Sequence, residues 1–162
     1  MKILDKKNDL IAKIEKINLK DSLQEVLLSI NSLFQNSKTI IDIDFSHFET
    51  VNFNKTYLKS IFLNLITNSI KYGKRDTSSI VTFTSNTNNG IKQLIITDNG
   101  IGFDMNKVKD KIFGLHQTFN TNLDSSGIGL YLVYNHITSL EGHIALESKI
   151  DEGAKFIITF PD

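Results

Sequence analysis

Cysteine is absent from the 162-residue sequence, which excludes disulfide bonds and thiolate metal sites and fits a reducing compartment. An excess of either charge is absent too, because 18 basic side chains balance 18 acidic ones, so no large field directs the chain toward nucleic acid or a membrane. No apolar run approaches the roughly 20 residues needed to cross a bilayer. The first residues, MKILDKKNDLIAKIEK, carry scattered charges without an unbroken apolar stretch, unlike a secretory signal. We therefore expect a soluble cytoplasmic domain that contacts neither nucleic acid nor membrane.

Helical periodicity is the clearest pattern in what remains. A hydrophobic content of 40% over this length is enough for one domain with a substantial core. Apolar residues at helical spacing predict helices over residues 3–14, 21–34, 55–72 and 127–142. Ser22 and Glu25 have the spacing of a capping box, and Asn54 can cap the third helix. Gly73 and Gly142 would end the third and fourth helices.

Strand patterns complete the predicted fold. Alternating apolar and polar residues predict a strand over residues 40–45, and two segments flanking NTNNG, residues 79–85 and 91–98, are typical of a β-hairpin. A second hairpin is expected from residues 143–160 around the turn DEG. Residues 104–126 are polar and irregular apart from MNKVKDKIFGL, as in a lid. Together these elements predict an α+β two-layer sandwich, with a mixed, largely antiparallel sheet of about five strands and three main helices on one face.

The predicted helix over residues 55–72 has two distinct faces. One face is apolar and would meet the sheet, whereas Tyr57, Asn64, Asn68 and Lys71 form a second stripe. Amide oxygens can bind a hard cation such as Mg²⁺, and a lysine one turn further on can reach phosphate oxygens. The alternative interpretation is a solvated helix face, although two asparagines weaken a helix without local gain.

Asp98 ends an apolar strand and is followed by Asn99, Gly100 and Gly102. A buried carboxylate is costly unless hydrogen-bond donors satisfy it. Those donors can be the amides of its own turn, or a ligand N–H group such as the exocyclic amine of adenine. The two glycines would let a flat ring approach the backbone. The sequence DNG is also a common turn signal, so both interpretations stay open.

A third motif, SSGIGLYLV at residues 125–133, places two glycines where a polar loop becomes a helix. Accessible amides at a helix N-terminus can bind an anion. The motif is neither a Walker loop nor a dinucleotide fingerprint, because no Gly-Lys-Ser/Thr follows it and no strand precedes it.

Taken in order, these motifs resemble a known family. The segments NLITNSIKYG, TDNGIGFD, IFGLHQTFNTNLDSSGIGL and EGHIALESKIDEGAKFIITFP are similar to the N box, glycine boxes, lid and final strands of the ATP-binding domain of sensor histidine kinases, which has the Bergerat fold. The resemblance covers about residues 18–162. It implies ATP and Mg²⁺ as ligands and protein-histidine kinase activity in two-component signal transduction.

The resemblance also implies roles for single residues. Asn68 corresponds to the magnesium-ligating asparagine, and Asn64 to the N-box residue one turn earlier. Lys71 corresponds to the lysine that contacts phosphate, and Tyr72 to the aromatic residue beside the base. Asp98 corresponds to the carboxylate that reads adenine.

Glycine-box residues and one hydroxyl complete the predicted ATP site. Gly100 and Gly102 would line the base, while Gly127 and Gly129 would close over the phosphates. Thr159 resembles a buried hydroxyl that supports the Asp98 site through water. The remaining ATP-binding candidates from the same boxes are Ile101, Ser126, Ile128 and Leu130.

Two features depart from the family pattern. Ser126 stands where the second glycine box usually has a glycine, so lid closure would be stiffer, although a small residue should be tolerated there. The chain also lacks a histidine in an acidic-flanked box on a helical hairpin; its histidines are His47, His116, His136 and His143, each expected to be an ordinary surface or boundary residue. No catalytic residue is therefore assigned.

The resemblance predicts a division of the chain and a set of partners. Residues 1–16 would be the tail of a dimerisation and phosphotransfer hairpin, and residues 17–162 the ATP-binding domain. The ATP-binding domain would donate the γ-phosphoryl group to a histidine on that hairpin and act indirectly on a response regulator.

Three alternatives belong to the same fold or to another class of function. ATP hydrolases of this fold carry a glutamate as general base one turn before the magnesium asparagine, where this sequence has Asn64, which cannot take a proton at neutral pH. A serine kinase of this fold would differ in its protein substrate. A partner-binding module without activity would be expected to lose the pocket residues, which are intact here.

Overall fold

The computed structural model describes residues 12–114 and 129–161. The described helices are α2 (Leu19–Ser29), α3 (Asn31–Ser37), α4 (Lys55–Lys71), α5 (Met105–Val108) and α6 (Gly129–Thr138). The strands are β1 (Glu15–Asn18), β2 (Ile40–Asp44), β3 (Thr50–Phe53), β4 (Ile80–Asn88), β5 (Ile91–Asp98), β6 (His143–Ser148) and β7 (Ala154–Thr159). None of the helices in these two ranges is long and apolar enough to span a bilayer.

The main sheet has five strands in the order β2-β4-β5-β7-β6. β2 runs parallel to β4, and every other neighbouring pair is antiparallel, so the predicted mixed, largely antiparallel sheet is confirmed. In β4 and β7 every second residue is buried, because successive side chains of a strand point to opposite faces. One face of the sheet therefore carries the core.

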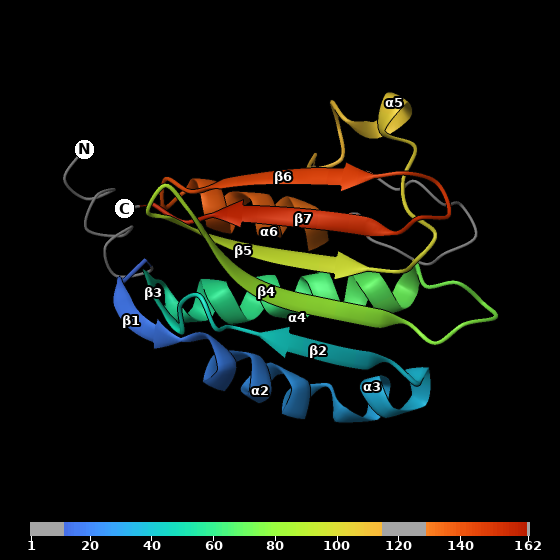
Figure 1. Ribbon diagram of the computed structural model, residues 1–162, viewed down its shortest axis with the longest axis horizontal. Helices are drawn as coiled ribbons and strands as arrows, with labels where there is room; N and C mark the ends of the chain where they lie inside the picture. The colour runs from blue at the N-terminus through green and yellow to red at the C-terminus, as the bar shows by residue number, and fades with distance from the viewer. Residues whose placement is uncertain (1–11, 115–128, 162) are drawn as a thin grey trace.

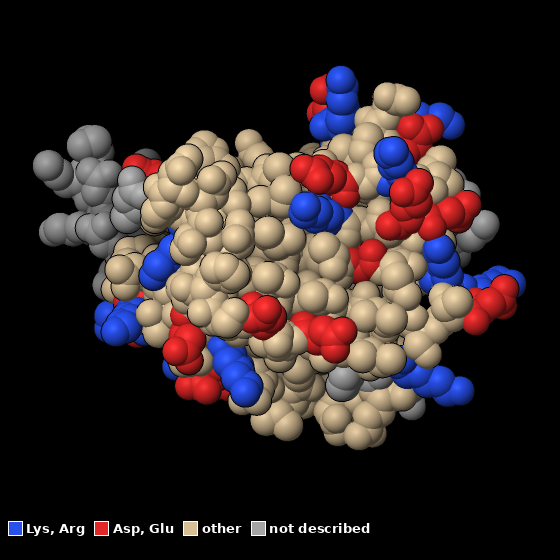
Figure 2. Space-filling view, in the orientation of Figure 1, with Lys and Arg blue, Asp and Glu red and all other residues tan. Residues whose placement is uncertain are grey.

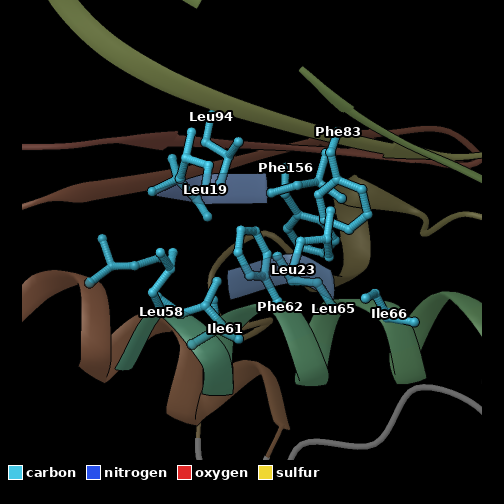
Figure 3. Close-up of a cluster of buried hydrophobic side chains, with 14 of the residues drawn as sticks. Leu19, Leu23, Leu58, Ile61, Phe62, Leu65, Ile66, Phe83, Leu94 and Phe156 are labelled. Atoms are coloured by element: carbon cyan, nitrogen blue, oxygen red, sulfur yellow. The ribbon is translucent and has the colours of Figure 1, made fainter. Parts of the chain in front are cut away.

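Three helices cover that face, as predicted (Figure 1). α4 packs between α2 and α6, and its inner side chains point at the sheet (Figure 3). The fully buried cluster is drawn from α2, α4 and the central strands, and it contains Leu19, Leu23, Leu58, Ile61, Phe62, Leu65, Ile66, Phe83, Leu94 and Phe156. The opposite face of the sheet is turned to the viewer in Figure 2, where its central part shows few charges.

Turn chemistry sets the register of the two hairpins. Asn89 and Gly90, with φ of 53° and 81°, form the two-residue turn between β4 and β5, a tighter connection than the five-residue NTNNG predicted from the sequence. β6 and β7 pair as predicted, with Ser148 opposite Ala154. Through the β5–β7 ladder, Ala154 also lies opposite Asp98, so both hairpins bring their ends to one edge of the core.

The N-terminal elements differ from the prediction. The predicted helix over residues 21–34 is two helices, α2 and α3, separated at Ile30, and Asn18 rather than Ser22 caps the first by accepting a hydrogen bond from the Asp21 N–H. Residues 3–11 of the predicted first helix lie outside the described residues, and Glu15 begins a strand that pairs with β3. Both strands have four residues, too short for a periodic signal.

Candidate functional site

Asp98 is the last residue of β5 and lies where α4, β5 and β7 meet. One carboxylate oxygen accepts hydrogen bonds from the Gly100 N–H at 2.9 Å and the Ala154 N–H at 3.2 Å. The other oxygen lies 3.0 Å from the Ser69 hydroxyl of α4. Part of the predicted need for donors is therefore met by its own turn, as in the turn interpretation. A carboxylate has about four acceptor positions, so the side chain keeps capacity for one further donor.

Burial dominates the electrostatics of this carboxylate. Removal from water raises the pKa of Asp98 above its usual value, although the hydrogen bonds from Gly100, Ser69 and Ala154 act in the opposite direction. A half-buried acidic group with a perturbed pKa beside a helix is a feature of functional sites more often than of ordinary surface. Asp98 is thus the strongest single candidate in the described part of the chain.

The glycines after Asp98 are required by neighbouring backbone. A Cβ on Gly100 would lie 2.6 Å from the carbonyl oxygen of Tyr72, too close for any side chain. Gly102 has φ of 71° and faces the carbonyl of Lys149, which would clash with a Cβ. Close approach by protein backbone accounts for both glycines, so approach by a ligand is not needed to explain them. The lining of a base by Gly100 and Gly102 stays a prediction.

Tyr72 ties the end of α4 to this glycine turn. Its carbonyl accepts a hydrogen bond of 2.9 Å from the Ile101 N–H, and its ring lies 6.0 Å from that of Phe103, tilted by 55°. A cavity of about 390 Å³ opens beside them. Its lining includes Tyr72, Ile101, Gly102, Lys107 and Ile150. Three predicted site residues, Tyr72, Ile101 and Gly102, are therefore brought together at a hollow with apolar and charged lining that is large enough for part of a small ligand.

The asparagine stripe of α4 faces the start of α6. Asn64 is half-buried, and its amide oxygen lies 3.2 Å from the position that a Cβ on Gly129 would occupy. Asn68 follows one turn later on the same stripe and is also half-buried, while Lys71 is exposed at the end of the helix. The structure thus places Asn64 of this stripe beside the first residue of α6, whereas the roles of Asn64, Asn68 and Lys71 in nucleotide binding stay predictions.

The second glycine box is described only in part. Ser126, Gly127 and Ile128 lie outside the described residues. Gly129 is the first residue of α6, and Leu130 packs partly buried against the core. Among the described residues no three or more His, Cys, Asp or Glu side chains gather as a metal site. The amide oxygens of the α4 stripe are of a type that can bind a hard cation.

The expectation for Thr159 is wrong. Thr159 pairs with Gln93 in the β5–β7 ladder, whereas Asp98 pairs with Ala154. At about 3.4 Å per residue, Thr159 lies roughly 17 Å along the strands from the carboxylate. Its hydroxyl is 3.3 Å from the Gln93 side-chain amide instead.

Ser69 supplies the hydroxyl that Thr159 does not. It is 3% exposed on the sheet-facing side of α4, and its hydroxyl is within hydrogen-bonding distance of both Asp98 and the Leu65 carbonyl. The signal was present in the sequence, because Ser69 is the polar residue on the otherwise apolar inner face of that helix. Its partner could be identified only once the end of β5 was placed beside the last turns of α4.

Comparison with known proteins gives one family and many relatives. Residues 54–162 match the family model described as histidine kinase-, DNA gyrase B-, and HSP90-like ATPase. The chain is 30% identical over 115 residues to the sensor histidine kinase AtsR of Burkholderia thailandensis, which covers 68% of the chain and 19% of that protein. It is 28% identical over 157 residues to the sensor protein BceS of Halalkalibacterium halodurans, covering 95% of the chain and 45% of that protein.

Solved structures agree on the fold. The catalytic domain of histidine kinase ThkA superposes with a TM-score of 0.76 at 20% identity, covering 92% of this chain and 97% of that one. Histidine kinase AdeS of Acinetobacter baumannii superposes with a TM-score of 0.74 at 20% identity, covering 91% and 66% of the two chains. The chain spans only part of the length of its curated relatives, from 13% to 45% in eight of them.

Proposed function

Because this chain belongs to the family of histidine kinase-, DNA gyrase B-, and HSP90-like ATPases, we propose that it is the ATP-binding catalytic domain of a sensor histidine kinase. The observation that carries the proposal is the environment of Asp98. Its carboxylate is half-buried at the rim of the core, held by three protein donors, and retains an acceptor position. In this proposal that position receives the exocyclic amine of adenine.

The phosphates and metal would lie beside the last turns of α4, along the stripe that carries Asn68 and Lys71. Asn68 would bind Mg²⁺ through its amide oxygen, with Lys71 reaching the phosphates as a mobile cation. When bound, Mg²⁺ would neutralise charge on the phosphate oxygens during transfer. The start of α6 at Gly129, which faces Asn64, would close this side together with the rest of the second glycine box.

The proposed reaction is transfer of the γ-phosphoryl group to a histidine, with loss of that histidine's proton and release of ADP. The phosphoacceptor would lie on a dimerisation hairpin, and the residues that precede β1 would be the tail of that hairpin. The phosphoryl group would then pass to a response regulator. On this chain, the contribution to catalysis is binding, orientation and charge stabilisation.

Hydrolysis of ATP is less well supported than transfer. The Asn64 amide donates hydrogen bonds to the carbonyl and hydroxyl of Ser60 and has no basic nitrogen, so it cannot activate water as a carboxylate would. An amide at this position is compatible with a kinase whose acceptor brings its own base.

Binding of a fluorescent ATP analogue, titrated with and without Mg²⁺, tests the proposal. We expect magnesium-assisted binding by the parent chain and at least a tenfold weaker affinity for Asp98→Asn, because the amide replaces an acceptor by a donor facing the base. Asp42→Asn, at an exposed position of β2, is the matched control and should bind like the parent. Equal affinity of Asp98→Asn and parent, with both folded by thermal melting, would overturn the adenine assignment.

A second measurement addresses the metal and the acceptor. Asn68→Ala should remove the magnesium dependence while leaving magnesium-free binding unchanged. Incubation of the chain alone with γ-labelled ATP should leave no acid-labile label on it, whereas a supplied hairpin carrying the phosphoacceptor histidine should become labelled. Label on this chain alone would place the phosphoacceptor among its own histidines.

A further inference from the structure

A series of polar side chains runs from Asn64, in the asparagine stripe of α4, to α6. The Asn64 amide nitrogen lies 2.8 Å from the Ser60 carbonyl and 3.2 Å from the Ser60 hydroxyl. That hydroxyl lies 3.2 Å from Nε2 of His136 on α6. The His136 ring stacks on Tyr57 at 4.3 Å, with 22° between the planes. We call Asn64, Ser60 and His136 the α4–α6 polar chain.

The backbone carbonyl of Ser60 identifies which end of the Asn64 side-chain amide is the NH₂ group. A carbonyl oxygen only accepts hydrogen bonds, so the group 2.8 Å away must be the NH₂ end of Asn64. The amide oxygen therefore points the other way, toward Gly129, where it lies 3.2 Å from the position of a Cβ. Asn64 presents an acceptor, and not a donor, to the start of α6.

Donor and acceptor roles also determine where the protons lie on the Ser60 hydroxyl and the His136 ring. When the Ser60 hydroxyl accepts from Asn64, its own proton is free to be donated to Nε2 of His136. This requires the neutral imidazole with its proton on Nδ1. Burial lowers the pKa of His136, which favours the neutral ring, and the stacked Tyr57 ring limits its rotation.

We propose that Ser60 and His136 are positioning residues that hold the Asn64 amide with its oxygen toward the metal and phosphate side of the nucleotide site. The Asn64 oxygen then serves as a ligand for the cation or for water on it, and cannot donate to phosphate. The role in binding rests on the proposed function, whereas the amide orientation does not. A merely structural contact between two helices would stabilise the fold without affecting how the metal assists binding.

Paired variants distinguish positioning of the Asn64 amide from packing of α6 against α4. Ser60→Ala removes the hydroxyl that links Asn64 to His136. His136→Phe keeps a ring on Tyr57 but removes the acceptor, and His136→Gln restores an acceptor near the position of Nε2. Thr138→Ala removes a hydroxyl of α6 that bonds only its own helix, and it is the matched control.

Two readouts are measured on the whole chain. The first is proton exchange at the Asn64 side-chain amide, followed by NMR without nucleotide and assigned by its loss in Asn64→Asp. The second is the ratio of ATP-analogue affinities with and without Mg²⁺. We expect Ser60→Ala and His136→Phe to speed amide exchange and to lower the affinity ratio about 3- to 10-fold, the range of one hydrogen bond. His136→Gln and Thr138→Ala should resemble the parent in both.

The outcomes distinguish this inference from the proposed function. If the parent binds no ATP analogue, the proposed function fails, while faster exchange in Ser60→Ala would still support the amide orientation. If the parent shows magnesium-assisted binding and neither variant changes the affinity ratio, the positioning role is overturned, whatever the exchange rates. A loss in His136→Phe that His136→Gln does not rescue would also overturn it. Thermal melting identifies variants that fail to fold. If His136→Phe fails to fold, Ser60→Ala still tests the proposal.

Discussion

The Ser69 hydroxyl lies 3.0 Å from a carboxylate oxygen of Asp98 and joins α4 to the end of β5. The same hydroxyl lies 2.9 Å from the Leu65 carbonyl, so its single proton is shared between the two acceptors. Both partners lie at the boundary between the core and the candidate site. This contact couples the stability of the domain to the charge of Asp98, the residue proposed to recognise adenine.

Replacement of Ser69 by alanine should destabilise the fold by about 1 kcal/mol, because a buried hydrogen bond is lost and a carboxylate oxygen loses a donor. It should also raise the pKa of Asp98 further, since the Ser69 hydrogen bond lowers that pKa. Chemical denaturation and the carboxyl ¹³C shift of Asp98 measure the two effects. Ser22→Ala is the matched control: Ser22 is 2% exposed on α2, and its hydroxyl has no hydrogen-bond partner among the described residues. Equal destabilisation by the two variants would show that the Ser69 contact contributes little.

The charge of Asp98 should make stability depend on pH. Burial raises its folded pKa above the unfolded value of about 3.8, so the native state holds the proton more tightly. The stabilising contribution is therefore fully present below the unfolded pKa and is lost as the pH rises through the folded pKa. We expect the free energy of unfolding of the parent, relative to Asp98→Asn, to decrease as the pH rises from 4 toward 7. A relative increase over that window would mean that the hydrogen bonds outweigh burial.

Strong local signals predicted much of this fold. Asn54 caps α4 as expected, accepting from the Tyr57 N–H at 2.9 Å, and the inner face of α4 is buried as its spacing predicts. The two hairpins and the mixed sheet were also predictable, because alternation and turn residues agree there. The capping box predicted at Ser22 does not form. Its spacing is present in the sequence, but Ser22 is buried on the inner face of α2, and Asn18 caps the helix four residues earlier.

Long-range register was the main limit for the site. The sequence indicates two hairpins, but it does not indicate that β5 and β7 are neighbours or which of their residues face each other. The ladder places Ala154 opposite Asp98 and moves Thr159 to the far end. For the same reason the Ser60–His136 contact, between residues 76 positions apart, was not foreseen. Periodicity assigns a residue to a face, whereas a partner on another element depends on how the elements are packed.

Thr159→Val should leave nucleotide binding unchanged, because Thr159 lies at the opposite end of the β5–β7 ladder from Asp98. Valine preserves the branched shape and removes the contact with the Gln93 side chain, which is half-buried on the uncovered face of the sheet. We expect a stability change within about 1 kcal/mol and parental affinity for the fluorescent ATP analogue. A several-fold loss of affinity in a normally folded variant would contradict the register on which the correction of Thr159 depends.

Alanine variants at Gly102 and Gly90 distinguish the cost of a left-handed backbone conformation from the cost of steric crowding. Both have positive φ, 71° and 81°, so alanine at either position incurs a left-handed cost of about 1–2 kcal/mol. A Cβ on Gly90 would meet nothing within 4 Å, whereas one on Gly102 would meet the carbonyls of Lys149 and Gly153. We therefore expect Gly102→Ala to lose about 1–3 kcal/mol more than Gly90→Ala, the usual cost of overpacking. Urea midpoints at an unchanged m-value measure the difference. Equal losses would mean that the loop after Asp98 yields easily, and that the turn beside the cavity is not held by Lys149.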